Sequence, residues 1–208
     1  LYYRWLAPRQ PIYLAYHALT LFAVLLTALP IIFHLTTPES YKLALGAAVL
    51  LSLPSLLQAV PLGGWRRWAA LAGLSFALGL AGWQARSWVP PATLWLTQVA
   101  LTAELGDGRT PGRSLATIDA ARLRANGLFA YTAIRAPRGL DERIYHVWQH
   151  DGTEVDRIAL DIKGGREEGY RAWTHKRNFP DAAAGRWQVR VLTEAGQMIG
   201  TLRFRVVE

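Results

Sequence analysis

The chain has 208 residues and no cysteine; 51% of the residues are hydrophobic, 18% are charged, and the formal net charge is +8. Its nine tryptophans, eight tyrosines and six phenylalanines exclude an intrinsically disordered chain, and its charged fraction lies below the quarter or so that is usual for a soluble domain. The lack of cysteine excludes disulfide scaffolds, cysteine-ligated zinc sites and thiol nucleophiles.

The two halves of the chain differ in charge. Residues 1–90 contain six basic residues and one acidic residue, Glu39, whereas residues 91–208 contain seventeen basic and fourteen acidic residues. The net charge therefore results mainly from the lack of carboxylates in the first half. A nucleic-acid-binding module would need a basic stripe on one face, so we expect no nucleic acid as a partner.

The first half contains three long apolar segments, at residues 12–34, 43–62 and 68–89. The first has 23 residues without a formal charge, and as a helix it would be about 34 Å long, enough to cross the hydrocarbon core of a bilayer. The second is also uncharged, and the third is uncharged until Arg86. We predict a membrane domain at residues 1–90 with three transmembrane helices, whose partner is the lipid bilayer.

Basic residues outside these segments predict the orientation. Arg4 and Arg9 precede the first segment, and Arg66 and Arg67 separate the second from the third. Because positively charged loops tend to stay in the cytoplasm, the N-terminus is expected there and residues 91–208 on the other side of the membrane. Leu1 stands where an initiator methionine would, and we expect further residues before it.

Small residues recur at helical spacing in the third segment. Ala69, Gly73 and Ala77 are four apart, and Gly79 follows Ser75 at the same interval. Such residues let helix backbones approach closely in lipid, so this face is a candidate for packing against the first two helices or against a partner. Glycine and alanine are also common in membrane helices without such a role, and this alternative stays open.

Few polar residues interrupt the apolar segments. His17, His34 and Gln84 are the only candidates for a proton or ion path, and no carboxylate accompanies them. A transporter usually places several ionisable groups within its spans, so we do not expect transport by this chain alone. We expect His17 to form a hydrogen bond between helices.

Residues 91–208 change to the alternating pattern of β-strands. Extended segments are predicted at 94–101, 128–134, 144–149, 155–162, 169–176, 186–193 and 198–207, while residues 115–124 fit a strand or a short helix. Asp151-Gly152 and Ala195-Gly196 are typical of tight turns. Short strands about ten residues apart predict an antiparallel, immunoglobulin-like β-sandwich at 91–208, so the fold class is α + β in separate domains.

Spaced aromatic and glycine residues in this half resemble a known pattern. They are Tyr145-His146-x-Trp148, the Asp151-Gly152 turn, Leu160-x-Ile162, Gly165, Tyr170-Arg171-x-Trp173-Thr174, Gly185-x-Trp187-x-Val189 and Gly196-x-x-x-Gly200. The pattern resembles a bacterial family of extracytoplasmic domains of unknown function that follow transmembrane helices. The resemblance implies a periplasmic β-domain behind an inner-membrane anchor, and it implies no activity and no catalytic residues.

Three histidines of the second half raise the question of a metal site. His146, His150 and His175 would bind a metal together with Asp151 or Glu154. The four-residue spacing of His146 and His150 aligns side chains on a helix but not on a strand, and no metal-binding motif is present. We interpret these residues as scattered histidines on the surface of the β-domain. We predict no catalytic, cofactor-binding or metal-binding residue and no cofactor.

The remaining group of interest is aromatic and basic. We predict a candidate interaction surface formed by Tyr170, Arg171, Trp173, Trp148 and His175. Exposed aromatic rings and arginines dominate protein interfaces, and aromatic rings also stack on sugars. In the alternative interpretation Trp148, Trp173 and Trp187 form the core of the sandwich, and Tyr170 and Arg171 stay outside.

Three functions are compatible with these patterns. We favour a non-enzymatic protein of the bacterial inner membrane that presents its sandwich in the periplasm as an accessory or structural subunit of a larger membrane complex, with other membrane-protein subunits as partners. The second is a module that binds envelope polysaccharide. The third is an enzyme whose site is completed by a partner chain.

Overall fold

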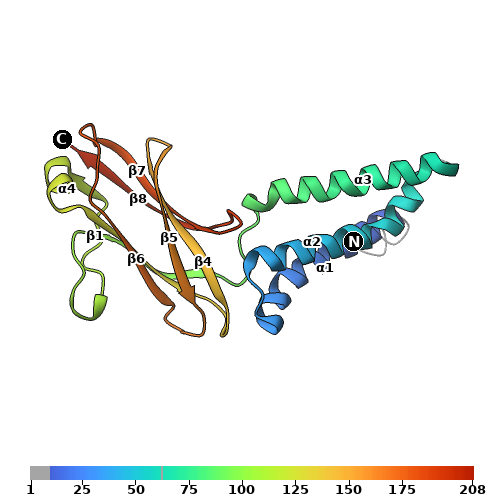
Figure 1. Ribbon diagram of the computed structural model, residues 1–208, viewed down its shortest axis with the longest axis horizontal. Helices are drawn as coiled ribbons and strands as arrows, with labels where there is room; N and C mark the ends of the chain where they lie inside the picture. The colour runs from blue at the N-terminus through green and yellow to red at the C-terminus, as the bar shows by residue number, and fades with distance from the viewer. Residues whose placement is uncertain (1–9, 62) are drawn as a thin grey trace. The chain divides into compact units, whose positions relative to one another are not determined.

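The computed structural model describes residues 10–61 and 63–208, and the chain divides into two compact units, Leu1–Ser87 and Trp88–Glu208. The first unit consists of helices and the second mainly of β-sheet (Figure 1). The fold class is therefore α + β, with the helices and the sheets in separate parts of the chain.

The helical unit is built from α1 (Gln10–Phe33), α2 (Thr37–Ala59) and α3 (Gly64–Gln84), which is followed by the short 3-10 helix η2 (Ala85–Trp88). Two segments, Ile12–Phe33 and Thr37–Ala59, are long and apolar enough to cross a membrane. Helix α3 begins earlier than the predicted segment, so Arg66 and Arg67 lie in its first turn rather than in a loop. These arginines and four glycines make α3 less apolar than α1 and α2, and its role as a third span stays a prediction.

Tyr41 joins the three helices. Its side chain is 1% exposed, and its hydroxyl donates a hydrogen bond to the Gly82 carbonyl oxygen of α3 at 2.7 Å. Its ring lies edge-on to Phe22 of α1, with centroids 5.5 Å apart, and to Trp83 of α3, with centroids 6.3 Å apart. Elsewhere the helices leave large apolar side chains uncovered, for example Phe33 at 65% and Leu50 at 66% exposure.

The second unit contains two sheets. The first has the strand order β1-β3-β6, and the second has the order β2-β8-β7-β4-β5. The strands are β1 (Trp95–Thr102), β2 (Thr117–Asp119), β3 (Leu128–Arg135), β4 (Asp141–His150), β5 (Thr153–Lys163), β6 (Tyr170–Lys176), β7 (Gly185–Thr193) and β8 (Met198–Val207). We call this unit the two-sheet domain.

Strand β2 departs from the predicted antiparallel arrangement. It pairs with β8 in parallel, whereas the other strand pairs are antiparallel. The chain reaches β2 by a loop from the other sheet. Because no hairpin joins β2 to β8, the two strands can pair in parallel. The strand ends after three residues because the Asp119 side chain accepts hydrogen bonds from the backbone N–H groups of Ala121 and Arg122 and so caps helix α4 (Ala120–Asn126). The ambiguous segment is thus a strand followed by a helix.

The two sheets enclose one core. Leu128 and Ile134 of β3 face this core from the three-stranded sheet, and Trp187 of β7 and Phe204 of β8 face it from the five-stranded sheet. Alternate residues of each strand point to the outer face of their sheet, as the strand geometry requires. A hairpin turn at Asp151-Gly152 joins β4 to β5, and both residues have positive φ, +46° and +87°, as predicted for a two-residue hairpin.

Candidate functional site

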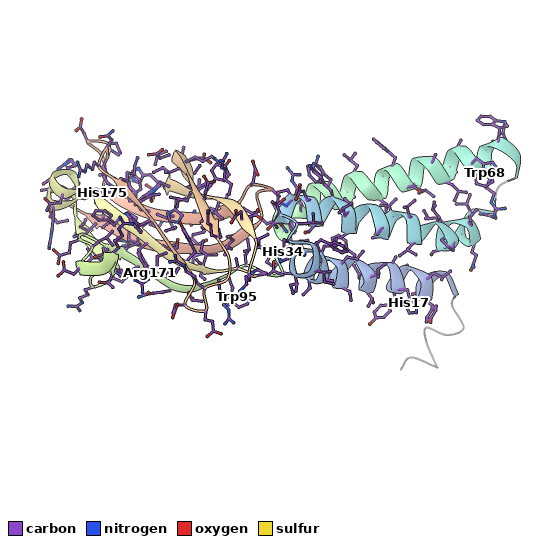
Figure 2. The ribbon with its side chains drawn as sticks, turned by 60° about the horizontal axis from the view of Figure 1, so that its bottom comes forward. His17, His34, Trp68, Trp95, Arg171 and His175 are labelled. Atoms are coloured by element: carbon purple, nitrogen blue, oxygen red, sulfur yellow. The ribbon has the colours of Figure 1, made fainter. Side chains whose placement is uncertain are left out.

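The outward-facing side chains of β6 form a row on the outer surface of the three-stranded sheet. We call Arg171, Trp173 and His175 the β6 row; Arg171 is exposed, and the other two are partly buried. Figure 2 shows Arg171 and His175 on the two-sheet domain. The sheet therefore brings together three of the five residues predicted to form an interaction surface.

The other two predicted residues face inward. Trp148 is fully buried, and its indole N–H donates to the hydroxyl of Thr174 at 3.3 Å. Tyr170 is partly buried and packs against the main core, with the Arg166 guanidinium 5.3 Å from its ring centroid. Trp187 is 1% exposed. In the alternative interpretation Trp148, Trp173 and Trp187 form the core; Trp148 and Trp187 do lie in the main core, and Trp173 does not.

A short hairpin at residues 103–112 contributes to the surface around the β6 row. The guanidinium carbon of Arg109 lies 5.1 Å from the ring centroid of Trp173, within cation–π range. Arg171 donates from Nη1 to the Gly108 carbonyl oxygen at 3.4 Å. Below the hairpin, Tyr131 is fully buried and packs in a small cluster with Trp173 and Leu105. These contacts leave Trp173 only partly accessible.

His175 lies at the end of the row, next to a hollow of about 500 Å³. Its ring stacks on Phe129, with centroids 3.8 Å apart and an interplanar angle of 12°. Its Nε2 lies 3.1 Å from the Asn126 carbonyl oxygen, and its Nδ1 accepts a hydrogen bond from Nε of Arg177 at 3.2 Å. Arg122 also lines the hollow. This end of the row therefore presents cationic groups beside aromatic rings.

His146 is not a surface residue, and our interpretation of it as one is wrong. It is fully buried between the sheets, where its Nε2 lies 3.1 Å from the Thr132 hydroxyl and its Nδ1 lies 3.1 Å from the Thr174 hydroxyl. Because Thr132 donates its own proton to the Ala172 carbonyl oxygen at 3.2 Å, it accepts from His146, so the ring carries its proton on Nε2. Thr174 accepts from Trp148 and donates to Nδ1.

These contacts form a continuous chain of hydrogen bonds across the core. It runs from the Trp148 indole through Thr174, His146 and Thr132 to the backbone of β6, and it links β4 of one sheet to β3 and β6 of the other. Burial lowers the pKa of His146 to about 4, so the ring is neutral at physiological pH. The sequence contained a signal for this position, because His146 alternates in phase with Ile144 and Trp148, both core residues.

The three histidines considered for a metal site lie apart. His146 contacts hydroxyls, His175 contacts Asn126 and Arg177, and His150 stacks on Trp187 with centroids 4.5 Å apart. The His150 Nε2 lies 3.5 Å from the Asp151 carboxylate, which is the closest approach of these rings to a carboxylate in the described chain. Within residues 10–61 and 63–208, no three metal-binding side chains gather at one place.

The predicted helix-packing residues fall on two sides of α3. Ala69, Gly73 and Ala77 are exposed, and a Cβ atom at Gly73 would meet nothing within 4 Å. Gly79 is partly buried, and a Cβ atom there would lie 3.9 Å from Val49 of α2. The first three residues are therefore exposed on α3, and their role in packing against a partner stays a prediction.

Among the glycines of α3, Gly82 lies nearest to another helix, and the sequence pattern does not single it out. A Cβ atom at Gly82 would lie 2.5 Å from Leu45 Cδ1 of α2. The Gly82 carbonyl also accepts the hydrogen bond from Tyr41. Gly82 follows Gly79 by three residues, so an interval of three rather than four would have pointed to it.

The isolated polar residues of the helices lie mainly at the surface. His17, expected to bond between helices, is exposed and its ring contacts Tyr13 of the same helix at 4.3 Å. His34 follows the end of α1 and has a φ of +55°, and Figure 2 shows His17 and His34 towards opposite ends of α1. Glu39 accepts hydrogen bonds from the backbone N–H of Thr36 at 3.0 Å and from its hydroxyl at 2.8 Å, which caps the start of α2.

The chain thus combines long apolar helices with a two-sheet domain whose sheets are joined by the hydrogen bonds of a buried histidine. Residues 1–130 match a family of unknown function, DUF5924, and the chain belongs to this family because the match covers more than half of it. Residues 141–206 match a second family of unknown function, DUF2914, which confirms the predicted resemblance to an uncharacterised domain family. No curated protein is significantly similar to the chain in sequence.

The two matches divide the two-sheet domain between them. The first ends within β3, and the second contains β4 to β8 with His146, Trp148 and Thr174. Because β3 pairs with β6, the three-stranded sheet needs residues from both matched regions. The His-x-Trp and Trp-Thr motifs behind the resemblance therefore supply three of the four side chains in the hydrogen-bond chain, and the fourth, Thr132, lies between the two matched regions.

Proposed function

We propose that the chain is a non-enzymatic protein of the bacterial inner membrane whose helices α1, α2 and α3 cross the bilayer. The observation that supports anchoring is the large apolar surface of the helices, where Leu19, Phe33, Leu50 and Phe76 are each more than 60% exposed. Such side chains are stable next to lipid, whereas monomeric soluble proteins rarely expose apolar patches of this extent. In this proposal the N-terminus is cytoplasmic and the two-sheet domain is periplasmic.

We further propose that the two-sheet domain is an immunoglobulin-like sandwich. The order β1-β3-β6 corresponds to strands A-B-E of that fold, and β8-β7-β4-β5 corresponds to G-F-C-C′. The buried Trp148 on the strand equivalent to C supports the same assignment. In place of a disulfide, the hydrogen-bond chain through His146 joins the two sheets.

The function we propose is that of an accessory subunit whose β6 row contacts another protein of the same membrane complex. The observation that carries this is the outer face of the three-stranded sheet, where Arg171, Trp173 and His175 stand in line and His175 lines a hollow of about 500 Å³. Arginine and tryptophan are the side chains most enriched at binding hot spots. The exposed face of α3 at Ala69, Gly73 and Ala77 offers a second contact within the membrane.

Binding of envelope polysaccharide has less support. Stacking on sugars needs open ring faces, but Trp148 and Trp187 are buried and Tyr170 packs on the core. Among the predicted tyrosine and tryptophan rings, only that of Trp173 lies in the β6 row, and the Arg109 guanidinium lies over it. A carbohydrate would have to displace this contact before it could stack.

The topology can be tested by cysteine labelling, because the chain has no native cysteine. Gly63→Cys lies at the start of α3 and Thr153→Cys lies at the start of β5, and both positions are exposed. With a membrane-impermeant maleimide that passes the outer membrane, we expect labelling of Thr153→Cys in intact cells and of Gly63→Cys only after the inner membrane is permeabilised. Labelling of both in intact cells, or the reverse pattern, would contradict the proposal.

The subunit role can be tested by affinity purification from mild detergent. We expect the wild-type chain to retain a stoichiometric membrane-protein partner, and Arg171→Glu and Trp173→Ala each to lose it. Arg138→Glu is the charge-matched control, since Arg138 is exposed in the loop after β3 and outside the β6 row. Recovery of a monodisperse chain without a partner, or equal retention by all variants, would refute the role of this face.

A further inference from the structure

The outer face of the five-stranded sheet carries four arginines on two neighbouring strands. We call Arg186 and Arg190 of β7 and Arg203 and Arg205 of β8 the arginine cluster. Their neighbours along each strand, such as Trp187 and Phe204, are buried in the core, so strand alternation directs the arginines outward. This surface is on the opposite side of the domain from the β6 row, because the core separates the two sheets.

The register brings like charges together. Arg186 is the direct partner of Arg205, and Arg203 is the partner of Gln188, which lies between Arg186 and Arg190 on β7. Cβ atoms of directly opposed residues on antiparallel strands are about 5 Å apart, and like charges at such positions are destabilising. The folded domain therefore tolerates a concentration of positive charge that packing does not require.

Carboxylates of the domain neutralise this charge only in part. Asp151 lies 3.9 Å from the Arg186 guanidinium, but its carboxylate also accepts the backbone N–H of Arg186 at 3.0 Å. Glu154, the acid that interacts with Arg190, forms two hydrogen bonds of 2.9 Å with Arg157. Among the described residues, Arg203 and Arg205 have no carboxylate within 4.0 Å.

A hollow of about 530 Å³ lies at the cluster. Arg186, Arg203 and Arg205 line it together with the amide of Gln188, and the Asp151-Gly152 turn forms part of its border. Its charged groups are three guanidinium groups and the Asp151 carboxylate, and this excess of donors suits an anion with several acceptor oxygens. An arginine can donate two parallel hydrogen bonds to a phosphate or a carboxylate.

We propose that the arginine cluster binds a phosphate-bearing ligand. Two facing guanidinium groups require about two negative charges at one point, and a phosphate monoester supplies about −1.5 to −2 at pH 7, whereas a carboxylate supplies one. Arg186 and Arg205 hold the phosphate, and Arg203 and Gln188 contact its remaining oxygens or a second anionic group. The same chemistry occurs in a lipid headgroup and in a soluble phosphorylated compound.

The test uses the full chain reconstituted in nanodiscs. One arm measures calorimetric binding of inorganic pyrophosphate in phosphatidylcholine discs, with citrate as the carboxylate control. The other arm measures hydrogen exchange of residues 185–206 in discs with and without phosphatidic acid. We expect binding or protection that weakens with added salt and that falls at least about tenfold in the double variant Arg186→Gln/Arg205→Gln.

Arg143→Gln is the matched control, because Arg143 is exposed on β4 of the same sheet but is already paired with Asp161 at 2.9 Å. It should bind as the wild type does. Pyrophosphate binding would identify a soluble ligand, and protection by phosphatidic acid alone would identify a headgroup; either supports the proposal. The absence of both signals, equal binding of citrate, or a double variant that binds like the wild type would overturn it.

Discussion

The imidazole of His146 and the hydroxyl of Thr174 meet at 3.1 Å in the middle of the two-sheet domain, one from each sheet. Thr174 also accepts the indole proton of Trp148, and it donates its own proton to the ring. Each polar atom of this contact is therefore used, which is the condition for placing polar groups in a core. The contact fixes the register of the two sheets in a chain that has no disulfide.

The first prediction concerns pH. The pKa of His146 is about 4 in the folded protein and about 6.5 when unfolded, so above pH 6.5 the ring is neutral in both states. As the pH falls from 6.5 to 4, only the unfolded chain takes up the proton. The free energy of unfolding should therefore fall by about 3 kcal/mol over this range because of His146, and the loss should level off below pH 4. Urea titrations of the full chain in mild detergent, followed by near-ultraviolet circular dichroism, measure it.

The comparison with His146→Gln isolates this effect. Carboxylates also contribute in acid, since the hydrogen bond from Arg143 lowers the pKa of Asp161, and stability gained from that pair is lost as the pH falls. Glutamine cannot take up a proton, so the variant should be less stable at pH 7.5 but should show a shallower decline towards pH 4.5. Parallel curves for the two proteins would mean that folding does not lower the pKa of His146.

The second prediction concerns Thr174→Val, which keeps the shape of the side chain and removes its hydroxyl. The indole N–H of Trp148 and Nδ1 of His146 would both lose their partner in the core. We expect a loss of about 3 kcal/mol in the free energy of unfolding at pH 7.5. Thr153→Val, at an exposed position at the start of β5, is the control and should change it by less than about 0.5 kcal/mol. Equal effects of the two substitutions would argue against the hydrogen-bond chain.

The third prediction distinguishes the two sides of α3. At Gly82 even an added Cβ atom would lie 2.5 Å from Leu45. The larger side chain of Gly82→Leu should therefore separate α3 from α2 and break the hydrogen bond from Tyr41. The cost should be about 1–3 kcal/mol, seen as a lower thermal unfolding temperature in detergent. A Cβ atom at Gly73 would meet nothing within 4 Å, so Gly73→Leu should leave that temperature unchanged. If Gly73→Leu instead destabilises the isolated chain, α3 packs through its other face.

Much of the two-sheet domain could be predicted because its strands alternate clearly. Met198–Val207 was expected at these bounds, and the hairpin at Asp151-Gly152 follows from two residues that tolerate positive φ. The parallel pairing of β2 could not be predicted, because the parallel or antiparallel direction of a three-residue strand depends on which edge is free in three dimensions. The start of α3 does not follow from the charge pattern, because arginine is compatible with both a loop and a helix end: its long stem can follow a helix surface while its charge stays in water.

Strand alternation predicts which side chains of the candidate site share a face of the sheet, but it does not predict how deeply each one is buried. Alternation places Arg171, Trp173 and His175 on one side of β6, but it does not show that Trp148 lies inside or that Arg109 reaches Trp173. The depth of His146 does not follow from its residue type, because histidine is intermediate in burial and two threonines distant in sequence satisfy both ring nitrogens. The arginine cluster depends on the β7–β8 register, which composition does not reveal.

Glu39 is the only carboxylate in residues 1–90, and it is held at the connection between α1 and α2 by the backbone N–H and the hydroxyl of Thr36. Anchoring as proposed would therefore carry no acidic side chain into the hydrocarbon. Transfer of the helices from water to lipid would therefore require no carboxylate to be neutralised, and no acidic group would oppose insertion at any pH. In that arrangement the fifteen aspartate and glutamate side chains of the chain would all lie outside the hydrocarbon.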